Sequence, residues 1–401
     1  MNSNWIKILH ATNPVKIDII SLKQNKINLK NIIPQSTPNE LAALTLYSQK
    51  EAINEHNIIL ASGKDFVALI DTGYEKTIDE LKTALNARAL TPEQITHVII
   101  DAHAHLWLWQ HTTVNNREIR QMPDGRSMFL GKEVQMMNPW MHDNYNSAEK
   151  LLANMDYAQV GGAVITQEFI DGLQNDYLDY ASRRWPERFF VYGMCDCRQP
   201  GFIVEAQTLL RRGFKGIKLP AARLIDDNGR IRFDTPEFME MFKMMERHGM
   251  ILHIELADGD VQCGELENVI SECPGLKIVI GHFCMATREG WMSQVMMARH
   301  PNVYIDMGGV TWLYNDEYYP YPSAIRAMRE AAGAVGMDKI MWGSDYPRTI
   351  TAITYRQSYD WILLSEELTD SEKYDVLGRT AEQVYGFSDI PRLRYIPNMS
   401  E

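Results

Sequence analysis

From Val98 onward, short apolar runs alternate with longer amphipathic stretches. Eight runs are predicted as strands: Val98–His103, Gly162–Thr166, Phe189–Gly193, Gly216–Leu219, Met250–Glu255, Lys277–Gly281, Val303–Asp306 and Ile340–Gly343. The predicted helices are Ser147–Gln159, Asn175–Arg184, Ile203–Arg212, Pro236–Gly249, Gly264–Cys273, Trp291–Arg299, Tyr321–Gly336 and Ile350–Ser365. This order predicts an α/β protein whose parallel strands close into a (β/α)8 TIM barrel. A doubly wound open sheet fits about six strands better than eight, and no GxGxxG follows the first run.

The first 97 residues have a different pattern, which predicts a small α+β segment. Strands are expected at Ile17–Leu22 and Ile27–Ile33, and a hairpin is expected to join Ile58–Ser62 to Phe66–Asp71. Helices are expected at Ala42–Ile53 and Thr77–Ala87. We therefore predict three parts: the segment 1–97, a barrel over 98–390 and a tail over 391–401.

Within the barrel, the stretch Leu108–Asp143 is long and rich in Asn, Met and Trp. It follows the first predicted strand, at the end of a barrel where loops build active sites. We expect an insertion that forms a lid over the site.

The chain has 401 residues and a net charge of −12. Such a surface repels nucleic acid and anionic membranes, so we expect neither as a partner. The first residues lack the apolar core of a signal peptide, and no apolar run is long enough to span a membrane. The five cysteines include no CxxC pair, which favours reduced thiols and a cytoplasmic location. A homo-oligomer stays open.

Polar side chains stand at the ends of several predicted strands. His103 and His105 are two residues apart in the first strand, so both can face one point. Imidazole suits zinc and similar divalent ions. An HxH pair is weak evidence by itself, because two histidines hydrogen-bonded at a loop have the same pattern.

Three later positions strengthen the metal hypothesis. His253 lies inside the apolar fifth strand, where a polar side chain needs a partner. Glu255 shares its face, and we favour His253 over Glu255 as a ligand. His282 follows the sixth strand and Asp345 the eighth. Catalytic groups in barrels come from the carboxyl ends of strands, so we expect these side chains to meet.

Three segments resemble signatures of the amidohydrolase-related (amidohydrolase-2) family. They are Ile100–His105 (IDAHAH), Gly281–Phe283 (GHF) and Trp342–Pro347 (WGSDYP). Thr380–Gln383 is similar to a terminal helix of that family, and the resemblance spans about Val98–Phe387. It implies a TIM barrel and a metal-dependent activity, since the family includes lactonases, other hydrolases and non-oxidative decarboxylases.

The resemblance also implies roles for individual residues. His103, His105, His253 and Asp345 would be metal ligands, and His282 would act as an acid/base or polarise a carbonyl. Lys218 lies where binuclear relatives carry a carbamylated lysine, but the group resembled here usually binds one metal. We therefore interpret Lys218 as a cation for substrate or structure.

These ligands predict a metal-dependent hydrolase. One divalent ion, zinc or else manganese or iron, would lower the pKa of a bound water. Asp345 would accept its proton, and His282 would stabilise the oxyanion of a lactone, an amide or a related carbonyl. Arg348 and Arg288 lie on loops where they could bind the carboxylate of a small-molecule substrate; solvated loop arginines are the alternative.

The N-terminal piece resembles half of a metallo-β-lactamase fold. Phe66–Gly73 and Thr77–Val98 match the Asp-Thr-Gly strand end and the helix that precede an HxHxDH motif in those enzymes. Here Leu106–Leu108 follows His105, so the required Asp and His are absent and we interpret Asp71 as structural.

Three alternatives to the hydrolase remain at this point. The same barrel and metal could serve a non-oxidative decarboxylase, which would release CO2. A metallo-β-lactamase-type hydrolase would need the missing motif. A non-catalytic barrel used for binding would have no reason to keep all five candidate residues.

Overall fold

The computed structural model describes residues 16–27, 52–62, 67–70, 98–114, 117–391 and 393. Contacts divide the chain into two compact units, residues 1–97 with 395–401 and residues 98–394. The predicted tail, 391–401, lies almost entirely outside the described residues.

The described part of the first unit is an antiparallel sheet of β1 (Lys16–Ile27), β2 (Ala52–Ser62) and β3 (Val67–Ile70). Ser62 pairs with Val67 and Ile59 with Ile70, as the predicted hairpin requires. The predicted helix Ala42–Ile53 is wrong at its end, because residues 52 and 53 pair with β1. Its earlier residues and the predicted helix Thr77–Ala87 lie outside the described residues, as does most of the predicted strand Ile27–Ile33.

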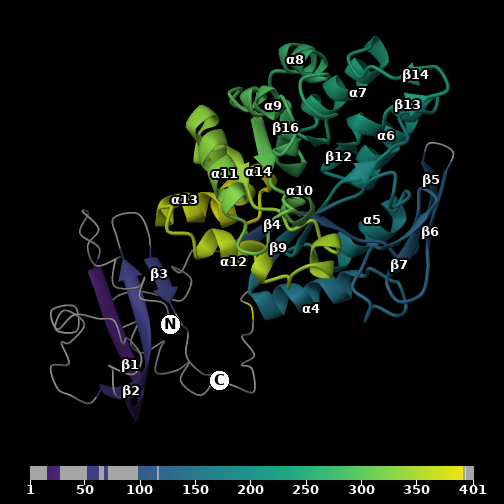
Figure 1. Cartoon of the computed structure of the whole chain (residues 1–401). Helices are drawn as coiled ribbons and strands as arrows, with labels where there is room; N and C mark the ends of the chain where they lie inside the picture. The colour runs from purple at the N-terminus through teal and green to yellow at the C-terminus, as the bar shows by residue number, and fades with distance from the viewer. Residues whose placement is uncertain are drawn as a thin grey trace. The chain divides into compact units, whose positions relative to one another are not determined.

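The second unit is built around parallel strands that run in sequence order (Figure 1). They are β4 (Ile99–His105), β9 (Val160–Thr166), β10 (Phe189–Val191), β11 (Gly193–Met194), β12 (Gly216–Leu219), β15 (Ile251–Ile254), β16 (Lys277–Ile280), β17 (Val303–Asp306) and β18 (Ile340–Met341). β10 and β11 are separated only by Tyr192, so they make one interrupted third strand. The Ala102 amide donates to the Trp342 carbonyl and the His105 amide to the Tyr346 carbonyl, at 2.9 and 2.8 Å. These bonds connect the segment after β18 to β4 and close the barrel, which confirms the predicted fold class.

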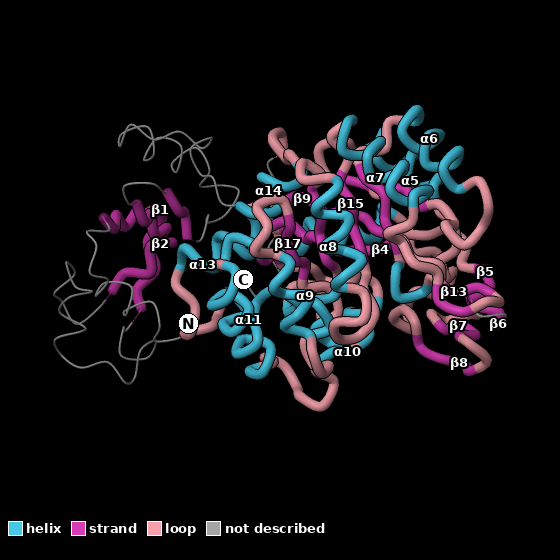
Figure 2. The backbone as a smooth tube through the Cα atoms, turned by 90° about the horizontal axis from the view of Figure 1, so that it is seen from above, coloured by secondary structure: helices cyan, strands magenta, loops and turns pink. Residues whose placement is uncertain are grey.

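Helices cover the outside of the strands, as Figure 2 shows for α7, α8 and α9. The helices are α4 (Ala148–Ala158), α5 (Asn175–Arg184), α6 (Phe202–Arg212), α7 (Pro236–Arg247), α8 (Cys263–Glu272), α9 (Trp291–Met297), α10 (Val310–Leu313), α11 (Pro322–Val335), α12 (Gln357–Leu363), α13 (Asp370–Tyr374) and α14 (Thr380–Tyr385). Shorter helical turns are η4 (Ala221–Arg223), η5 (His282–Met285), η6 (Met337–Lys339), η7 (Arg348–Thr351) and η8 (Asp375–Arg379). The predicted helix Ile350–Ser365 is divided, because η7 and α12 flank a non-helical stretch.

The insertion after β4 is a four-stranded antiparallel sheet. Its strands are β5 (His111–Val114), β6 (Arg117–Gln121), β7 (Arg126–Phe129) and β8 (Lys132–Gln135). A second small hairpin, β13 (Ile225–Asp226) with β14 (Gly229–Arg230), follows η4.

Apolar side chains fill the interior of the barrel near the start of its strands. This inner cluster includes Ile100, Phe190, Ile251 and Val279, and Tyr385 of α14 packs into it. A barrel interior of this kind is a packed core rather than a pore. Polar side chains therefore gather at the opposite, carboxyl end of the strands.

Candidate metal centre

A β-bulge in β4 sets the direction of its two histidines. Ile100 and Ala102 face the inner apolar cluster, and the register with β9 then shifts between Asp101 and Ala104. An extra residue in one strand reverses which side chains face inward, so that His103 and His105 point to the centre. The Asp101 carboxylate accepts bonds from the His103 amide at 3.1 Å and the Ser344 amide at 2.8 Å, which fixes the bulge.

The backbone around His103 is closely packed. A Cβ atom added at Gly308 or at Gly343 would lie 2.6 Å from the His103 side chain. Glycine is required at these positions because a larger residue would displace the imidazole.

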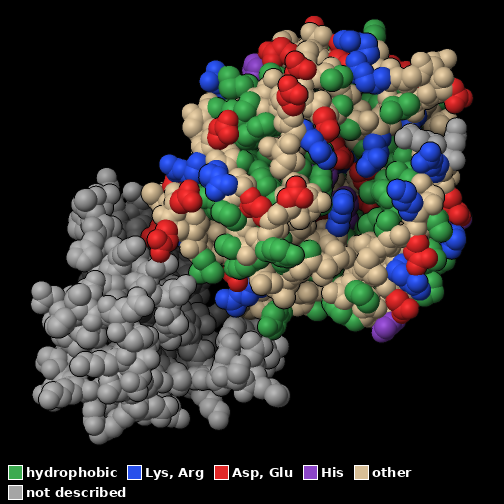
Figure 3. Space-filling view, in the orientation of Figure 1, with side chains coloured by type: hydrophobic (Ala, Val, Ile, Leu, Met, Phe, Trp, Pro, Cys, Tyr) green, Lys and Arg blue, Asp and Glu red, His purple; other side chains and the backbone are tan. Residues whose placement is uncertain are grey.

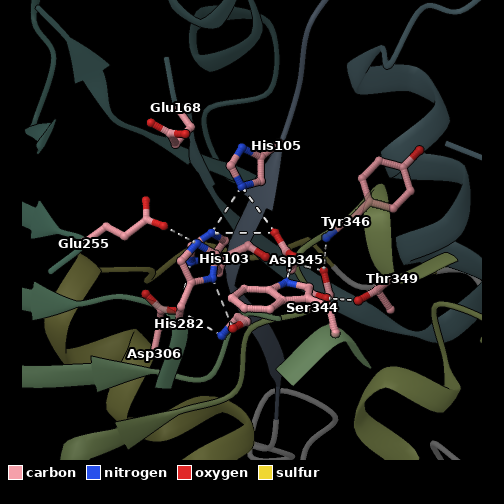
Figure 4. A network of polar contacts seen from close by, with 12 residues as sticks. His103, His105, Glu168, Glu255, His282, Asp306, Ser344, Asp345, Tyr346 and Thr349 are labelled. Carbon is pink, nitrogen blue, oxygen red and sulfur yellow. Dashed lines mark hydrogen bonds and ion pairs between the residues drawn. The ribbon is translucent and has the colours of Figure 1, made fainter. Parts of the chain in front are cut away.

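His103, His105 and Asp345 form the first group of converging side chains (Figure 4). The Nε2 atoms of the two histidines are 3.2 Å apart. Asp345 Oδ1 lies 3.4 Å from His105 Nε2 and 3.9 Å from His103 Nε2. Asp345 has a φ of 58°, a strained conformation for this residue type, and its amide donates to the His103 carbonyl. All three side chains are buried.

Two further carboxylates define the tautomers of these histidines. Asp306 Oδ1 is 2.8 Å from His103 Nδ1, and Asp171 Oδ2 is 2.7 Å from His105 Nδ1. Carboxylates accept, so each Nδ1 donates and each Nε2 presents a lone pair to the other. Two lone pairs at 3.2 Å repel unless a cation lies between them. The residues therefore fit a metal ion bound by two imidazoles and one carboxylate.

The pKa of His105, unlike that of His103, indicates the same demand for positive charge. Burial lowers the pKa of His105, but the Asp171 and Asp345 carboxylates outweigh it and raise that pKa to about 10. Burial lowers the pKa of His103 despite Asp306. A proton on His105, or a metal ion at the same point, would balance the negative charge of Asp171 and Asp345.

His253 belongs to a second group, with His103 and Asp306. Its Nε2 donates to Asp306 Oδ2 at 2.6 Å, so Asp306 bridges the two histidines. Burial and the nearby Lys218 lower the pKa of His253 to about 3, which keeps this imidazole neutral. The structure thus brings His103, His105 and Asp345 to one point and directs the His253 Nε2 atom to Asp306 instead.

His282 begins a turn of four residues with positive φ, His282–Met285. Its Nδ1 donates to the Gly308 carbonyl at 3.2 Å, and its Nε2 lies 3.3 Å from Glu255 Oε1. Glu255 raises the pKa of His282 although burial opposes this. The His282 ring is 4.5 Å from that of His103, measured between centroids. The predicted acid/base residue is therefore next to the first group.

Lys218 is fully buried and its Nζ lies 3.5 Å from Glu255 Oε2. Arg223, a residue that sequence reasoning missed, is 2.5 Å from Glu168 Oε2. Figure 3 shows Lys and Arg side chains around a hollow in the surface, with acidic side chains inside it. Such a mixture of charges suits a polar ligand better than an apolar one.

The two predicted substrate arginines differ in position. The Arg348 guanidinium lies over the Trp312 ring at 5.0 Å, and the Trp312 Nε1–H donates to Asp345 Oδ2 at 2.7 Å. Arg348 is therefore one side chain away from the first group. Arg288 is about half exposed and lies 3.6 Å from Asp258, so its predicted contact with substrate has no support from its neighbours.

Sequence reasoning missed Asp306, Asp171 and the Trp312 hydrogen bond. Asp306 is the last residue of β17, so the strand-end rule that found His282 and Asp345 could have found it too. Asp171 lies five residues beyond β9 in a loop, where no spacing rule identifies it.

The fold and these groups define a (β/α)8 barrel with a candidate metal centre at the carboxyl ends of its strands. The amidohydrolase family profile matches residues 100–387, and the chain belongs to this family. It is an enzyme of that family, which confirms the resemblance found in the sequence. No curated protein matches the chain.

Solved structures share the fold. A probable 2-pyrone-4,6-dicarboxylic acid hydrolase of Acinetobacter baumannii with bound citric acid is 17% identical, with 72% of this chain and 99% of that chain covered and a TM-score of 0.53. An amidohydrolase of Burkholderia multivorans with bound zinc is 16% identical, with 72% and 99% covered and a TM-score of 0.53. A 2,6-dihydroxybenzoate decarboxylase of Rhizobium is 13% identical, with 72% and 98% covered and a TM-score of 0.50. Among the described residues, no helix combines the length and apolar character of a membrane span.

Proposed function

We propose that this enzyme is a metal-dependent hydrolase that opens a lactone, an amide or a related carbonyl of a small, carboxylate-bearing molecule. The observation that carries the proposal is the approach of two imidazole lone pairs and one carboxylate oxygen within 3.9 Å. Nitrogen-rich donor sets of this kind favour zinc, with manganese or iron as alternatives.

In this proposal His103, His105 and Asp345 hold the metal. Three protein ligands leave the open position that a catalytic metal needs. His253 was our preferred further ligand and Glu255 its alternative. Since His253 Nε2 is bonded to Asp306 and Glu255 faces His282, we propose that both support the ligands instead.

The protein's own groups then have distinct tasks. A divalent ion held by these residues would supply Lewis-acid chemistry and make a nearby water more acidic. Asp345 would accept a proton at this site, since its Oδ1 faces His105 Nε2 and its Oδ2 is held by Trp312. The Nε2–H of His282, which lies 3.3 Å from Glu255 Oε1, would turn to or be shared with the substrate carbonyl as negative charge develops on its oxygen.

We propose that Lys218 and Arg348 bind the carboxylate of the substrate. The Lys218 Nζ is fully buried and, apart from an ion pair with Glu255 Oε2 at 3.5 Å, makes no hydrogen bond to any described residue. A buried ammonium that lacks hydrogen-bond acceptors is costly. A substrate carboxylate would supply them. Arg348 is exposed and lies over the Trp312 ring, so it can meet a second anionic group. Arg288 stays a prediction, as do the cytoplasmic location and self-association.

Metal analysis of the purified enzyme, combined with a panel of lactones and aromatic carboxylates, tests this proposal. We expect about one metal ion per chain and hydrolysis of at least one carboxylate-bearing lactone or amide. His105→Ala should remove metal and activity together. His282→Ala should keep the metal but lose activity, and His142→Ala, at an exposed histidine, should change neither.

Two outcomes would contradict the proposal. Release of CO2 from an aromatic carboxylate, without hydrolysis of any compound, would show that the enzyme is a decarboxylase. Full activity in protein stripped of metal would show that the histidines act by another chemistry.

A further inference from the structure

We propose that the inserted sheet β5–β8 is a buttress that holds Asp171 against His105 and thereby sets the metal affinity of the site. This inference rests on the proposed function. It gives the insertion, which the sequence suggested as a lid, the task of positioning a ligand.

Asp171 is held on two sides. Its Oδ2 accepts from His105 Nδ1 at 2.7 Å and from the Glu168 amide at 2.9 Å. The Asp171 amide in turn donates to the Glu168 carbonyl at 2.9 Å. The side chain is buried, so the carboxylate has a fixed position and orientation. It determines that His105 presents Nε2, not Nδ1, to the metal.

The loop that carries Asp171 is bonded to the inserted sheet through Gln110. This glutamine is fully buried, and its Nε2 donates to the Ile170 carbonyl at 3.1 Å. Its Oε1 accepts from Ser127 Oγ of β7 at 2.7 Å. Its backbone N–H donates to Gln121 Oε1 of β6 at 2.9 Å. The Gln110 side chain thus joins β7 to the residue beside Asp171, and its backbone adds a bond to β6.

Apolar packing connects the same two segments. Val114 of β5, Ile119 of β6, Phe169 of the loop and Met194 of β11 form a separate buried cluster. The Arg198 guanidinium covers the Phe169 ring at 4.0 Å. The loop of Phe169 and Asp171 packs against this cluster on one side and is bonded to His105 on the other. A loop held on two sides resists displacement. The sheet therefore acts on His105 without touching it.

Asp171 is a positioning residue in this view, so the test measures metal binding rather than turnover. The zinc dissociation constant of the whole enzyme is measured by competition with a chromophoric chelator for the wild type, Asp171→Asn and Gln110→Met. Loss of a carboxylate that holds a ligating histidine usually weakens metal binding about 10- to 100-fold, which we expect for Asp171→Asn. Gln110→Met, which contacts no ligand, should show a smaller loss in the same direction.

A matched control and a spectrum separate positioning from general damage. Gln135 of β8 also donates to backbone carbonyls, those of Asp124 and Met137, away from the loop. Gln135→Met should keep the wild-type affinity. With Co²⁺ in place of zinc, the visible absorption bands should shift in Asp171→Asn and stay unchanged in Gln135→Met, because they report the ligands of the ion.

The outcomes are distinct. Wild-type zinc affinity and Co²⁺ bands in both Asp171→Asn and Gln110→Met would overturn the buttress while leaving the hydrolase proposal intact. Equal losses in Gln110→Met and Gln135→Met would also overturn it, since the loss would then not depend on the bond from Gln110 to the loop that carries Asp171. A wild-type enzyme that binds no metal would reject the proposed function and this inference together.

Discussion

Asp306 offers a quantitative test of the site, because one carboxylate bonds to both histidines of the second group. Its Oδ1 accepts from His103 Nδ1 and from the Gly308 amide, at 2.8 and 2.9 Å, and its Oδ2 accepts from His253 Nε2 at 2.6 Å. All of this lies in the fully buried interior. The His103 and His253 rings depend on this carboxylate for their orientation.

Asp306→Ala and Asp306→Asn should lower the free energy of unfolding by different amounts. Asp306→Ala leaves two imidazole donors and the Gly308 amide without this acceptor, and an unsatisfied buried donor costs about 1–3 kcal/mol. We expect the free energy of unfolding to fall by about 3–9 kcal/mol. In Asp306→Asn the amide oxygen can keep the His103 and Gly308 bonds, and its NH2 can donate to His253 Nε2 if the neutral imidazole carries its proton on Nδ1 instead. Only the charge is lost, so we expect a fall of about 1–2 kcal/mol.

Urea unfolding of the metal-free proteins measures these differences. Asp176, whose side chain is 98% exposed, provides the control, and Asp176→Ala should change the unfolding free energy by less than about 0.5 kcal/mol. An Asp306→Ala protein within about 1 kcal/mol of the wild type would refute the reasoning, since the two histidines would then not depend on Asp306.

Two further predictions concern Trp312 and His253. Trp312→Phe removes the donor to Asp345 Oδ2, and we expect kcat to fall about tenfold, the worth of one hydrogen bond; steady-state kinetics with unchanged kcat would contradict this. The pKa of His253 is about 3 in the folded protein and near 6.5 in the unfolded chain. Between about pH 3 and pH 6.5 the unfolded chain therefore binds more protons than the folded protein. The unfolding free energy of the metal-free enzyme should therefore fall as pH drops from about 6.5 towards 3. His253→Gln should flatten this slope in urea titrations, and an identical slope would show that His253 is not held neutral.

The strand-end rule predicted much of the barrel and its polar rim from sequence. Apolar runs mark parallel strands, and closure of the barrel brings their carboxyl ends together. This is why His103, His105, His282 and Asp345, which are up to 242 positions apart in the sequence, lie around one point. Their roles as ligands and catalysts stay predictions until metal binding is measured.

The parts that sequence could not predict depend on tertiary contacts. Alternation in β4 would put His103 on the face opposite Ala102, and only the bulge held by Asp101 brings it to the centre. The partner of His253 is Asp306 from a strand two positions away in the sheet, so the strand of His253 alone could not show it.

The insertion and the N-terminal unit show a different limit of prediction from sequence: strands that form only by pairing with other strands. Residues 108–143 are interpreted as a lid because they form a long insertion after the first strand, and no strands are predicted in them, yet cross-strand pairing forms β5–β8. Residues 52 and 53 continue a helical pattern on paper but pair with β1. In both places partner strands decide the structure, which local propensity does not show.

The most direct test is a crystal structure of the enzyme grown with zinc, with anomalous diffraction measured at the zinc edge. We predict one strong peak about 2.0–2.2 Å from His103 Nε2, His105 Nε2 and an Asp345 oxygen. An anomalous map with no peak among these three side chains, from protein that binds zinc in solution, would contradict the account.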